Sequence, residues 1–287
     1  MGGEFDATRA CEPRAAAVVT VDGDHLEHLG PTLVDVARTK ARIAPPGGIL
    51  VVGERRPDRA WVLDAEGSAA GATLWRRGVE FDWELEGAGA RFVGPARSVA
   101  GLRPGMAGAH QAHNAAVAVA AADALCVAAG LPLCSDDAVR EGVRSASVPG
   151  RFEVFPATRS KPVVLLDGAH NPAGAEALAL LLAARPRPRR RWLLFAAMSD
   201  KDYGDVLATL LPHVDRALCC AGGSTPRYAS PATLVDAVQA LGGDGEDVGD
   251  PAAGLDRALA LLDPNDELLV AGSLYLLGEV RPLLFGR

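Results

Sequence analysis

Three side chains able to bind or transfer charge follow one apolar run. The run Val163–Leu166 predicts a buried strand, and Asp167, His170 and Asn171 come directly after it. Asn171 is a favourable N-cap and Pro172 suits a first helical turn, so a helix is expected to begin there. The N–H groups of a helix start favour an anion, and Asp167 lies where open α/β sheets hold a ribose, a metal ion or an ammonium group. A capped turn without any ligand is an equally good interpretation of this pattern alone.

Other polar residues occupy comparable places earlier in the chain. Asp24 and His25 follow a predicted strand, and Asn114 lies near the start of a predicted helix, where its amide is able to pair with adenine. Lys40 is one of only three lysines in a chain whose cations are otherwise arginines. Because the two side chains are not equivalent chemically, a retained lysine suggests a need for an amine.

The elements that would position these residues form two groups. In the first half we expect strands at 15–21 and 48–53, helices at 32–41, 57–65, 111–129 and 135–146, and a small β-meander within 80–98. After a linker at 148–151, we expect strands at 163–167, 192–198, 216–221 and 267–273, with helices near 173–184, 202–212, 231–241 and 252–262. Regular strand–helix alternation predicts a doubly wound, mostly parallel α/β sheet.

Composition excludes several classes of function. No apolar run approaches the roughly 18 to 20 residues of a membrane span, and the N-terminus does not resemble a signal peptide. The net charge of −7 argues against nucleic acid or an acidic membrane as the main partner. Five cysteines without a CxxC pair indicate thiols in a reducing compartment. A cytoplasmic protein is therefore expected.

The strand-to-helix motif, Asp167 to Pro172, resembles the C-terminal motif of the folylpolyglutamate synthase/dihydrofolate synthase family, ATP-dependent amide ligases related to the Mur ligases. Seven further segments resemble family motifs and run in the family's order. They are Gly2-Gly3-x-x-Asp6-Ala7-Thr8, Asp24-His25-x-x-x-Leu29-Gly30, Ala37-x-x-Lys40-Ala41-x-Ile43, Gly108-x-His110-Gln111-x-x-Asn114-Ala115-Ala116, Pro149-Gly150-Arg151-x-Glu153, Asp200-Lys201-Asp202 and Gly272-Ser273-x-Tyr275. Glu4, Arg9 and Arg42 depart from the family's usual Arg, Asn and Gly.

The resemblance implies a role for each motif residue. It places His25 and a carbamylated Lys40 on magnesium, with Lys40 and His170 as the catalytic residues. It places ATP at Asn114, Arg151 and Asp167, the incoming L-glutamate at His170 and Ser273, and the pterin near Phe5, Asp6 and Ala7. Its cofactors are ATP and Mg²⁺, and its substrates are a folate or pteroate and L-glutamate.

The resemblance also implies a domain plan. Residues 1–148 would be the C-terminal portion of a P-loop ATPase domain, and residues 149–287 a Rossmann-like glutamate-ligase domain. The chain contains no Gly-Lys dipeptide, hence no Walker-type loop, and corresponds to about the last two thirds of a complete enzyme. We therefore expect a truncated, split or decayed enzyme that does not hydrolyse ATP alone. A separate N-terminal half is a candidate partner.

Three functions follow from this reading. The first is an ATP-dependent ligase that adds L-glutamate to dihydropteroate, reduced folates or both, through an acyl phosphate. The second is a Mur-type or cyanophycin-type ligase acting on another acid. The third is a non-catalytic nucleotide-binding or assembly module. We expect two α/β lobes whose strand-end polar groups, including Asn114, Arg151 and Asp167, face a shared nucleotide.

Overall fold

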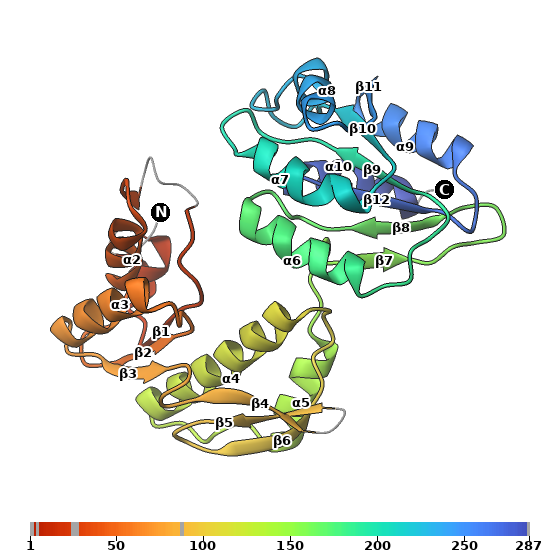
Figure 1. The fold of residues 1–287 in the computed structure, drawn as a ribbon. Helices are drawn as coiled ribbons and strands as arrows, with labels where there is room; N and C mark the ends of the chain where they lie inside the picture. Colours follow the sequence, from red (N-terminus) through yellow and green to blue (C-terminus); the bar gives the residue numbers. More distant parts are fainter. Residues whose placement is uncertain (1–2, 4–5, 24–28, 87–88, 286–287) are drawn as a thin grey trace. The chain divides into compact units, whose positions relative to one another are not determined.

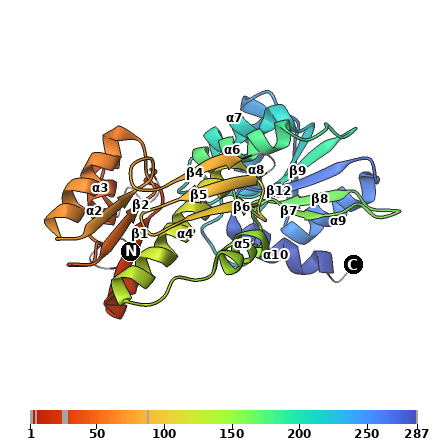
Figure 2. The same cartoon turned by 90° about the horizontal axis from the view of Figure 1, so that it is seen from below.

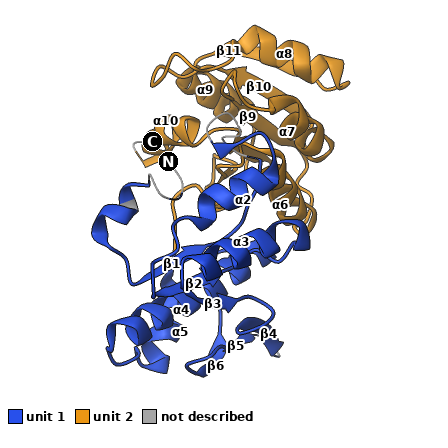
Figure 3. Ribbon diagram, turned by 90° about the vertical axis from the view of Figure 1, so that its left-hand side faces the viewer, with its two compact units in different colours: residues 1–146 blue, residues 147–287 orange. Residues whose placement is uncertain are grey.

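The computed structural model describes residues 3, 6–23, 29–86 and 89–285 (Figure 1). The chain divides into two compact units, residues 1–146 and 147–287, which Figure 3 distinguishes by colour. The division lies two residues before the boundary expected from the sequence, next to the Val148–Arg151 linker. The two units are described separately below.

The first unit is built on a parallel sheet in the order β1 (Ala15–Val18), β2 (Ile49–Val52), β3 (Thr73–Arg76). Alternate β2 side chains enter different cores, as the two-residue period of a strand requires. Leu50 and Val52 pack with α2 (Leu33–Ala41) and α3 (Pro57–Ala69), whereas Ile49 and Val51 pack with α4 (Ala109–Ala129). Helices therefore cover both faces of this sheet.

A small antiparallel meander completes the first unit. It comprises β4 (Asp82–Glu86), β5 (Gly89–Val93) and β6 (Ser98–Leu102), and Figure 2 shows these strands side by side along α4. Phe92 and Val99 pack into the α4 core, and α5 (Asp136–Ser145) contacts β6. The expected meander is present, but it extends to residue 102.

The second unit has one six-stranded sheet in the order β11-β10-β9-β12-β8-β7. Its strands are β7 (Glu153–Phe155), β8 (Val163–Leu166), β9 (Arg191–Phe195), β10 (Arg216–Cys220), β11 (Gly245–Gly249) and β12 (Glu267–Ala271). Five run parallel and β7 is antiparallel at one edge. Helices α6 (Pro172–Ala183), α7 (Tyr203–Leu210) and α8 (Pro231–Ala240) pack on one core; α9 (Pro251–Leu261) and α10 (Leu274–Phe285) pack on the other.

Helix starts agree closely with the caps in the sequence. Thr32, Ser135 and Asn171 each accept a hydrogen bond from the backbone N–H three residues on, at 3.2, 3.2 and 2.8 Å. Such side chains satisfy N–H groups that the helix cannot pair itself. Strand ends agree less well: β1 ends at Val18, not Val21, and β12 ends at Ala271, not Ser273.

Five elements were not expected from the sequence. These are the 3₁₀ helix η2 (Ala7–Cys11), β3, β7, β11 and α10. β11 lies at a sheet edge and reads Gly-Glu-Asp-Val-Gly, without the apolar run that marks a buried strand. α10 contains Gly278 and Pro282, residues that normally argue against a helix.

The expectation that no stretch approaches membrane-spanning length was wrong for α4. This helix has 21 residues and, by length and composition alone, is the one described helix able to cross a membrane. Buried core helices pass the same test. α4 packs on β1 and β2, and its Asp123 is 2% exposed and paired with Arg97 at 2.5 Å, which are features of a core helix.

Candidate functional site

The carboxyl ends of the parallel strands in the second unit carry the largest group of motif residues. β12 lies between β8 and β9, yet the helix after β12 covers one face while the helices after β8 and β9 cover the other. Loops that leave neighbouring strands toward opposite faces open a crevice between them, where open α/β sheets bind ligands. The loops at 167–171, 196–202 and 272–273 border this position.

Asp167 is held by backbone N–H groups on both sides. Its Oδ2 accepts from Phe152 N at 2.8 Å, and its Oδ1 accepts from Ala169 N at 2.9 Å. Next to it, Gly168 N donates to Gly150 O at 2.8 Å. Phe152 has φ +50, an uncommon conformation for a residue other than glycine. The Asp167 carboxylate therefore ties the linker to the strand end and orients the residues that flank Arg151.

His170 is oriented by its own loop. Its Nδ1 lies 2.8 Å from Gly168 O. A carbonyl oxygen only accepts, so Nδ1 carries the proton in the neutral ring and Nε2 is the acceptor nitrogen. This orientation suits a group that binds, or takes a proton from, an amine.

Ser273 lies at the start of α10, one loop away from His170. Its side chain is 3% exposed, and its Oγ accepts from Tyr275 N at 3.2 Å. The preceding Gly272 donates to Ala169 O at 2.9 Å and so connects the loops after β12 and β8. A Cβ on Gly272 would lie 2.5 Å from Ala196 O, and its φ is +106, so this close approach requires glycine.

Two further loops are tied to this edge through residues that sequence reasoning did not single out. Glu279 of α10 accepts from Ser224 Oγ at 2.5 Å and from Gly223 N at 3.2 Å. The Tyr228 hydroxyl lies 3.5 Å from Glu279 Oε1 and also hydrogen-bonds Ser273. Burial raises the pKa of Tyr228 to about 12, and the Glu279 carboxylate adds to the rise.

Asp200, Lys201 and Arg151 lie on the same unit. Asp200 pairs with Arg227 at 2.6 Å, which joins the loops after β9 and β10. The Arg151 side chain is exposed and makes no hydrogen bond or ion pair with any residue in the described part of the chain. A guanidinium in this state is available to a phosphate or carboxylate.

In the first unit, Asn114 borders an apolar pocket of about 380 Å³. α4, α5 and the loop before α4 form it, and its walls include Pro104, Met106, Ala118 and Val139. Asn114 Nδ2 donates to Gln111 Oε1 at 3.1 Å. The Asn114 amide still has another N–H and an oxygen to offer, so this pocket, called the apolar slot below, combines apolar walls with a donor and an acceptor.

Lys40 lies near the carboxyl end of β1, where its Nζ donates to Thr20 O at 3.3 Å. An acid, Glu54, lies at the carboxyl end of the neighbouring strand β2 and is 5% exposed. It accepts from Val21 N at 2.9 Å and from Arg56 Nη2 at 2.6 Å. Burial alone would raise the pKa of Glu54, but the hydrogen bonds from Arg56 and Val21 outweigh it and hold the pKa at about 2. Its position directly after a strand is the signal that could have identified it.

The proposed metal ligands do not assemble in the described residues. His25 lies outside them, and within them no three His, Cys, Asp or Glu side chains gather as metal ligands would. Asp22 and Glu54 near Lys40 are both paired with Arg56. The described groups therefore do not fit a metal site by themselves.

The N-terminal motif is attached to α2. Phe5 lies outside the described residues. Asp6 directly precedes η2, and Ala7 is its first residue. Gly3 is buried with φ +59, and a Cβ at this position would lie 1.9 Å from Thr39 O of α2. This close packing argues against a loose glycine-rich tail at Gly3.

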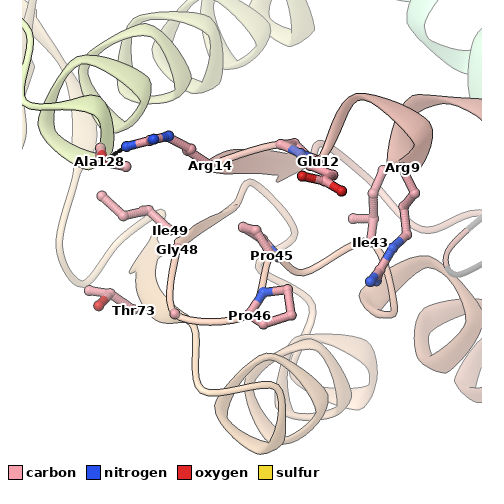
Figure 4. A pocket seen from close by; sticks show the side chains of 12 residues that line it. Arg9, Glu12, Arg14, Ile43, Pro45, Pro46, Gly48, Ile49, Thr73 and Ala128 are labelled. Atoms are coloured by element: carbon pink, nitrogen blue, oxygen red, sulfur yellow. Dashed lines mark hydrogen bonds between the residues drawn. The ribbon is translucent and has the colours of Figure 1, made fainter.

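A larger pocket of about 510 Å³ lies at the opposite, amino edge of the first sheet (Figure 4). Figure 4 shows Arg9 and Arg14 pointing to different ends of it. Arg14 donates to Ala128 O at the end of α4, and Arg9 donates to Arg42 O at the end of α2. Both guanidiniums therefore stabilise helix C-termini, and they do not converge on one ligand.

Comparison with known proteins gives one family. Residues 150–274 match the model of the Mur ligase glutamate ligase domain. The chain is 35% identical to the probable bifunctional folylpolyglutamate synthase/dihydropteroate synthase of Haloferax volcanii, covering 98% of this chain and 33% of the relative. It is 31% identical to the dihydrofolate synthase/folylpolyglutamate synthase of Mycobacterium tuberculosis, covering 100% of this chain and 63% of the relative.

Solved structures agree over the full chain. Escherichia coli FolC in complex with DHPP and ADP has a TM-score of 0.86 at 32% identity, covering 100% of this chain and 65% of that one. The Yersinia pestis folylpolyglutamate synthase/dihydrofolate synthase with Mn, AMPPNP and L-glutamate bound has a TM-score of 0.82 at 30% identity, covering 99% and 65%. The chain thus spans about two thirds of the length of these synthases and one third of the Haloferax volcanii protein. With its strand-end motifs, its α/β fold and this likeness in agreement, the chain belongs to the folylpolyglutamate synthase/dihydrofolate synthase family of the Mur ligase superfamily.

Proposed function

We propose that the protein to which this chain belongs is an ATP-dependent ligase that adds L-glutamate to dihydropteroate, reduced folates or both. The observation that carries the proposal is the meeting of two strand-end loops in the second unit: Asp167 and His170 follow β8, Ser273 follows β12, and a backbone hydrogen bond from Gly272 N to Ala169 O joins the loops. The relatives that support it are named as synthases of this kind, and one is solved with L-glutamate bound.

The proposed reaction proceeds in two steps. The folate-side carboxylate attacks the γ-phosphate of ATP, which gives an acyl phosphate and ADP. The L-glutamate amine then attacks the acyl carbon, phosphate leaves and a C–N bond forms, while the amine loses a proton. Positioning of the two reactants and stabilisation of the phosphate charge supply the rate enhancement.

Each motif residue has a role in this proposal. Asn114 reads adenine in the apolar slot of the first unit, and Arg151 binds phosphate oxygens. Asp167 holds the linker and takes part in nucleotide binding. His170 Nε2 and Ser273 bind the L-glutamate, with His170 accepting from its amine. The roles of Phe5, Asp6 and Ala7 at the pterin, and of His25 and a carbamylated Lys40 at Mg²⁺, stay predictions from the family motifs.

The domain plan is part of the same proposal. Residues 1–148 would be the C-terminal portion of the central ATPase domain, and residues 149–287 a Rossmann-like glutamate-ligase domain. ATP and Mg²⁺ are the proposed cofactors, in keeping with the AMPPNP and Mn of the Yersinia pestis structure. When bound, the metal ion supplies charge neutralisation at the phosphates.

The first test is calorimetry with ATP and the full chain. We expect Arg151→Gln to weaken ATP binding about tenfold, the value of one charge-assisted hydrogen bond to phosphate. Arg159→Gln is the matched control, because Arg159 is also exposed and unpaired among the described residues of the second unit. An equal loss in both variants, or no heat from the wild-type chain, contradicts the proposed nucleotide site.

The second test identifies the acceptor. ADP release is measured with L-glutamate and dihydropteroate, tetrahydrofolate or a UDP-muramoyl acid, with the chain alone and with an added N-terminal segment that carries a phosphate loop. We expect turnover only with the added segment and only with the pterin acids. Turnover with the muramoyl acid would favour a Mur-type ligase, and none with any acid would favour a binding module.

A further inference from the structure

A group of charged and titratable side chains lies at the carboxyl edge of the first sheet and has no role in the proposed ligase chemistry. Its members are Arg55, Arg77, Asp82, His110 and His113. Arg55 follows β2 by three residues, Arg77 follows β3 directly, and Asp82 opens β4. His110 and His113 lie one turn apart near the start of α4. The cationic groups therefore come from three elements: the ends of strands β2 and β3 and the first turns of helix α4.

The two guanidiniums converge on a single carboxylate. Arg55 Nη1 lies 3.5 Å from Asp82 Oδ2, and Arg77 Nε lies 3.3 Å from Asp82 Oδ1. Asp82 Oδ1 also accepts from Trp83 N at 2.8 Å. One acid thus faces two permanent cations, and the Arg77 side chain is only 11% exposed, so water screens its charge poorly.

α4 brings the histidines to the same place. The side of α4 that carries Val117 and Ala120 packs on the sheet, and Val117 Cγ2 lies 2.7 Å from where a Cβ of Gly53 would be. His113 lies one turn earlier on this side of the helix, just beyond the end of β2. Asn114 borders the apolar slot, which is on another side of α4, so the two places are distinct.

The electrostatic balance of the cluster is positive. Burial lowers the pKa of His113, and the charges of Arg77, Arg55 and His110 lower it further, while Asp82 alone opposes them. Burial is the larger cause of this shift, and the positive balance itself follows from the geometry, because two guanidiniums share the single Asp82 carboxylate. A positive potential at the carboxyl edge of a parallel sheet favours an anion.

We propose that Arg55, Arg77, His110 and His113 form a binding site for an oxyanion, the phosphoryl or carboxylate group of a small ligand. The planar guanidiniums supply paired donors, and each histidine adds an N–H when it is protonated. The site does not depend on the ligase chemistry proposed above, because none of its four side chains is assigned to ATP, glutamate or folate there.

The test follows the His113 imidazole by NMR in the full chain, with its resonance assigned from His113→Gln. Sulfate represents a phosphoryl group, acetate represents a carboxylate, and chloride at equal ionic strength measures screening alone. We expect sulfate to raise the pKa of His113 by about half a unit or more beyond chloride, since a bound anion stabilises the imidazolium. A larger response to acetate than to sulfate would assign the site to carboxylates.

Arg77→Gln should weaken sulfate binding about tenfold, and without sulfate it should raise the pKa of His113, because a neighbouring cation is lost. Arg103→Gln is the matched control, since Arg103 lies in the same unit and is exposed. If Arg77→Gln does not fold, Arg55→Gln carries the same expectation. An identical response to sulfate, acetate and chloride, or an equal loss in Arg103→Gln, overturns the proposal. Calorimetry with ATP tests the proposed nucleotide site in a separate experiment. The oxyanion site and the ligase function are therefore contradicted by different results.

Discussion

The carboxyl edges of the two parallel sheets are organised by different forces. In the second unit, the loops after β8 and β12 are held by backbone N–H groups: Asp167 accepts two of them, and Gly272 N joins the two loops through Ala169 O. In the first unit, the acids that follow or face the strand ends form ion pairs, Glu54 with Arg56 and Asp82 with Arg55 and Arg77.

This difference has a physical consequence. Backbone hydrogen bonds have fixed geometry and are little affected by salt, so the second edge is suited to holding small substrates in one orientation. Ion pairs respond to pH and ionic strength, so the first edge should be the part of the molecule whose stability changes with solution conditions. The following changes test the contrast.

The largest expected effect is in the second unit. Gly272→Ala places a Cβ 2.4 Å from the Phe195 ring and 2.5 Å from Ala196 O, at a φ of +106. We expect a loss of about 3 kcal/mol or more in the free energy of unfolding, from backbone strain and overlap together. Gly278→Ala, in α10 with open space around it, should instead stabilise the unit by about 0.5 to 1 kcal/mol. Hydrogen exchange of β12 and α10 peptides measures both, and similar exchange rates in the two variants would contradict the argument.

The next largest effect is a pH dependence of the stability of the first unit, caused by Glu54. The folded-state pKa of Glu54 is about 2, below its ordinary value of 4.5. Its contribution is therefore fully present above pH 4.5 and is lost as the pH falls toward 2. It amounts to at most about 3 kcal/mol. Glu54→Gln should remove this part of the acid dependence of unfolding in β1 and β2 peptides; an unchanged pH profile would show that the ion pair adds no net stability.

A smaller effect is expected for Asp167→Asn. One of the two backbone N–H groups, from Phe152 or Ala169, would then face an N–H₂ group and lose its acceptor. Burying an unpaired donor costs about 1 to 3 kcal/mol. Asp137→Asn is the control: its side chain is 94% exposed, so a change below about 0.5 kcal/mol is expected. Chemical denaturation at two salt concentrations should give the same loss for Asp167→Asn at both.

The smallest expected effect concerns Tyr228. Tyr228→Phe removes contacts with Glu279 and Ser273, worth about 0.5 to 1.5 kcal/mol. In an ultraviolet titration, the tyrosine with a pKa of about 12 should be missing from this variant. Tyr203→Phe, which removes a hydroxyl from the first turn of α7, should keep that ionisation. Retention of the high transition in Tyr228→Phe would show that another tyrosine is responsible.

Sequence reasoning predicted the helices better than the edges of the sheets. Helices with side-chain caps, such as Thr32 and Asn171, began where expected because capping is a local interaction. β7 and β11 were missed because edge strands need no apolar run; β7 is only three residues long, and the partner of β11, β10, lies a whole helix earlier in the chain.

The same distinction applies to the candidate sites. Asp167 and His170 became candidates because acid and imidazole directly follow a strand, a pattern visible within ten residues. Tyr228 and Glu279 are 51 residues apart, and Arg55 and Asp82 are 27 apart, so nothing local relates the members of either pair. Only the meeting of separate strand ends brings these side chains into contact.

By itself, the sequence determined the alternation of strands and helices, the caps and the family motifs, because these depend on neighbours within about one helical turn or one loop. The tertiary structure decided the strand order, the meeting of the loops after β8 and β12, and the convergence of two arginines on Asp82. Those features depend on which distant segments pack together, and packing is settled by the burial of whole faces, not by any single stretch of residues.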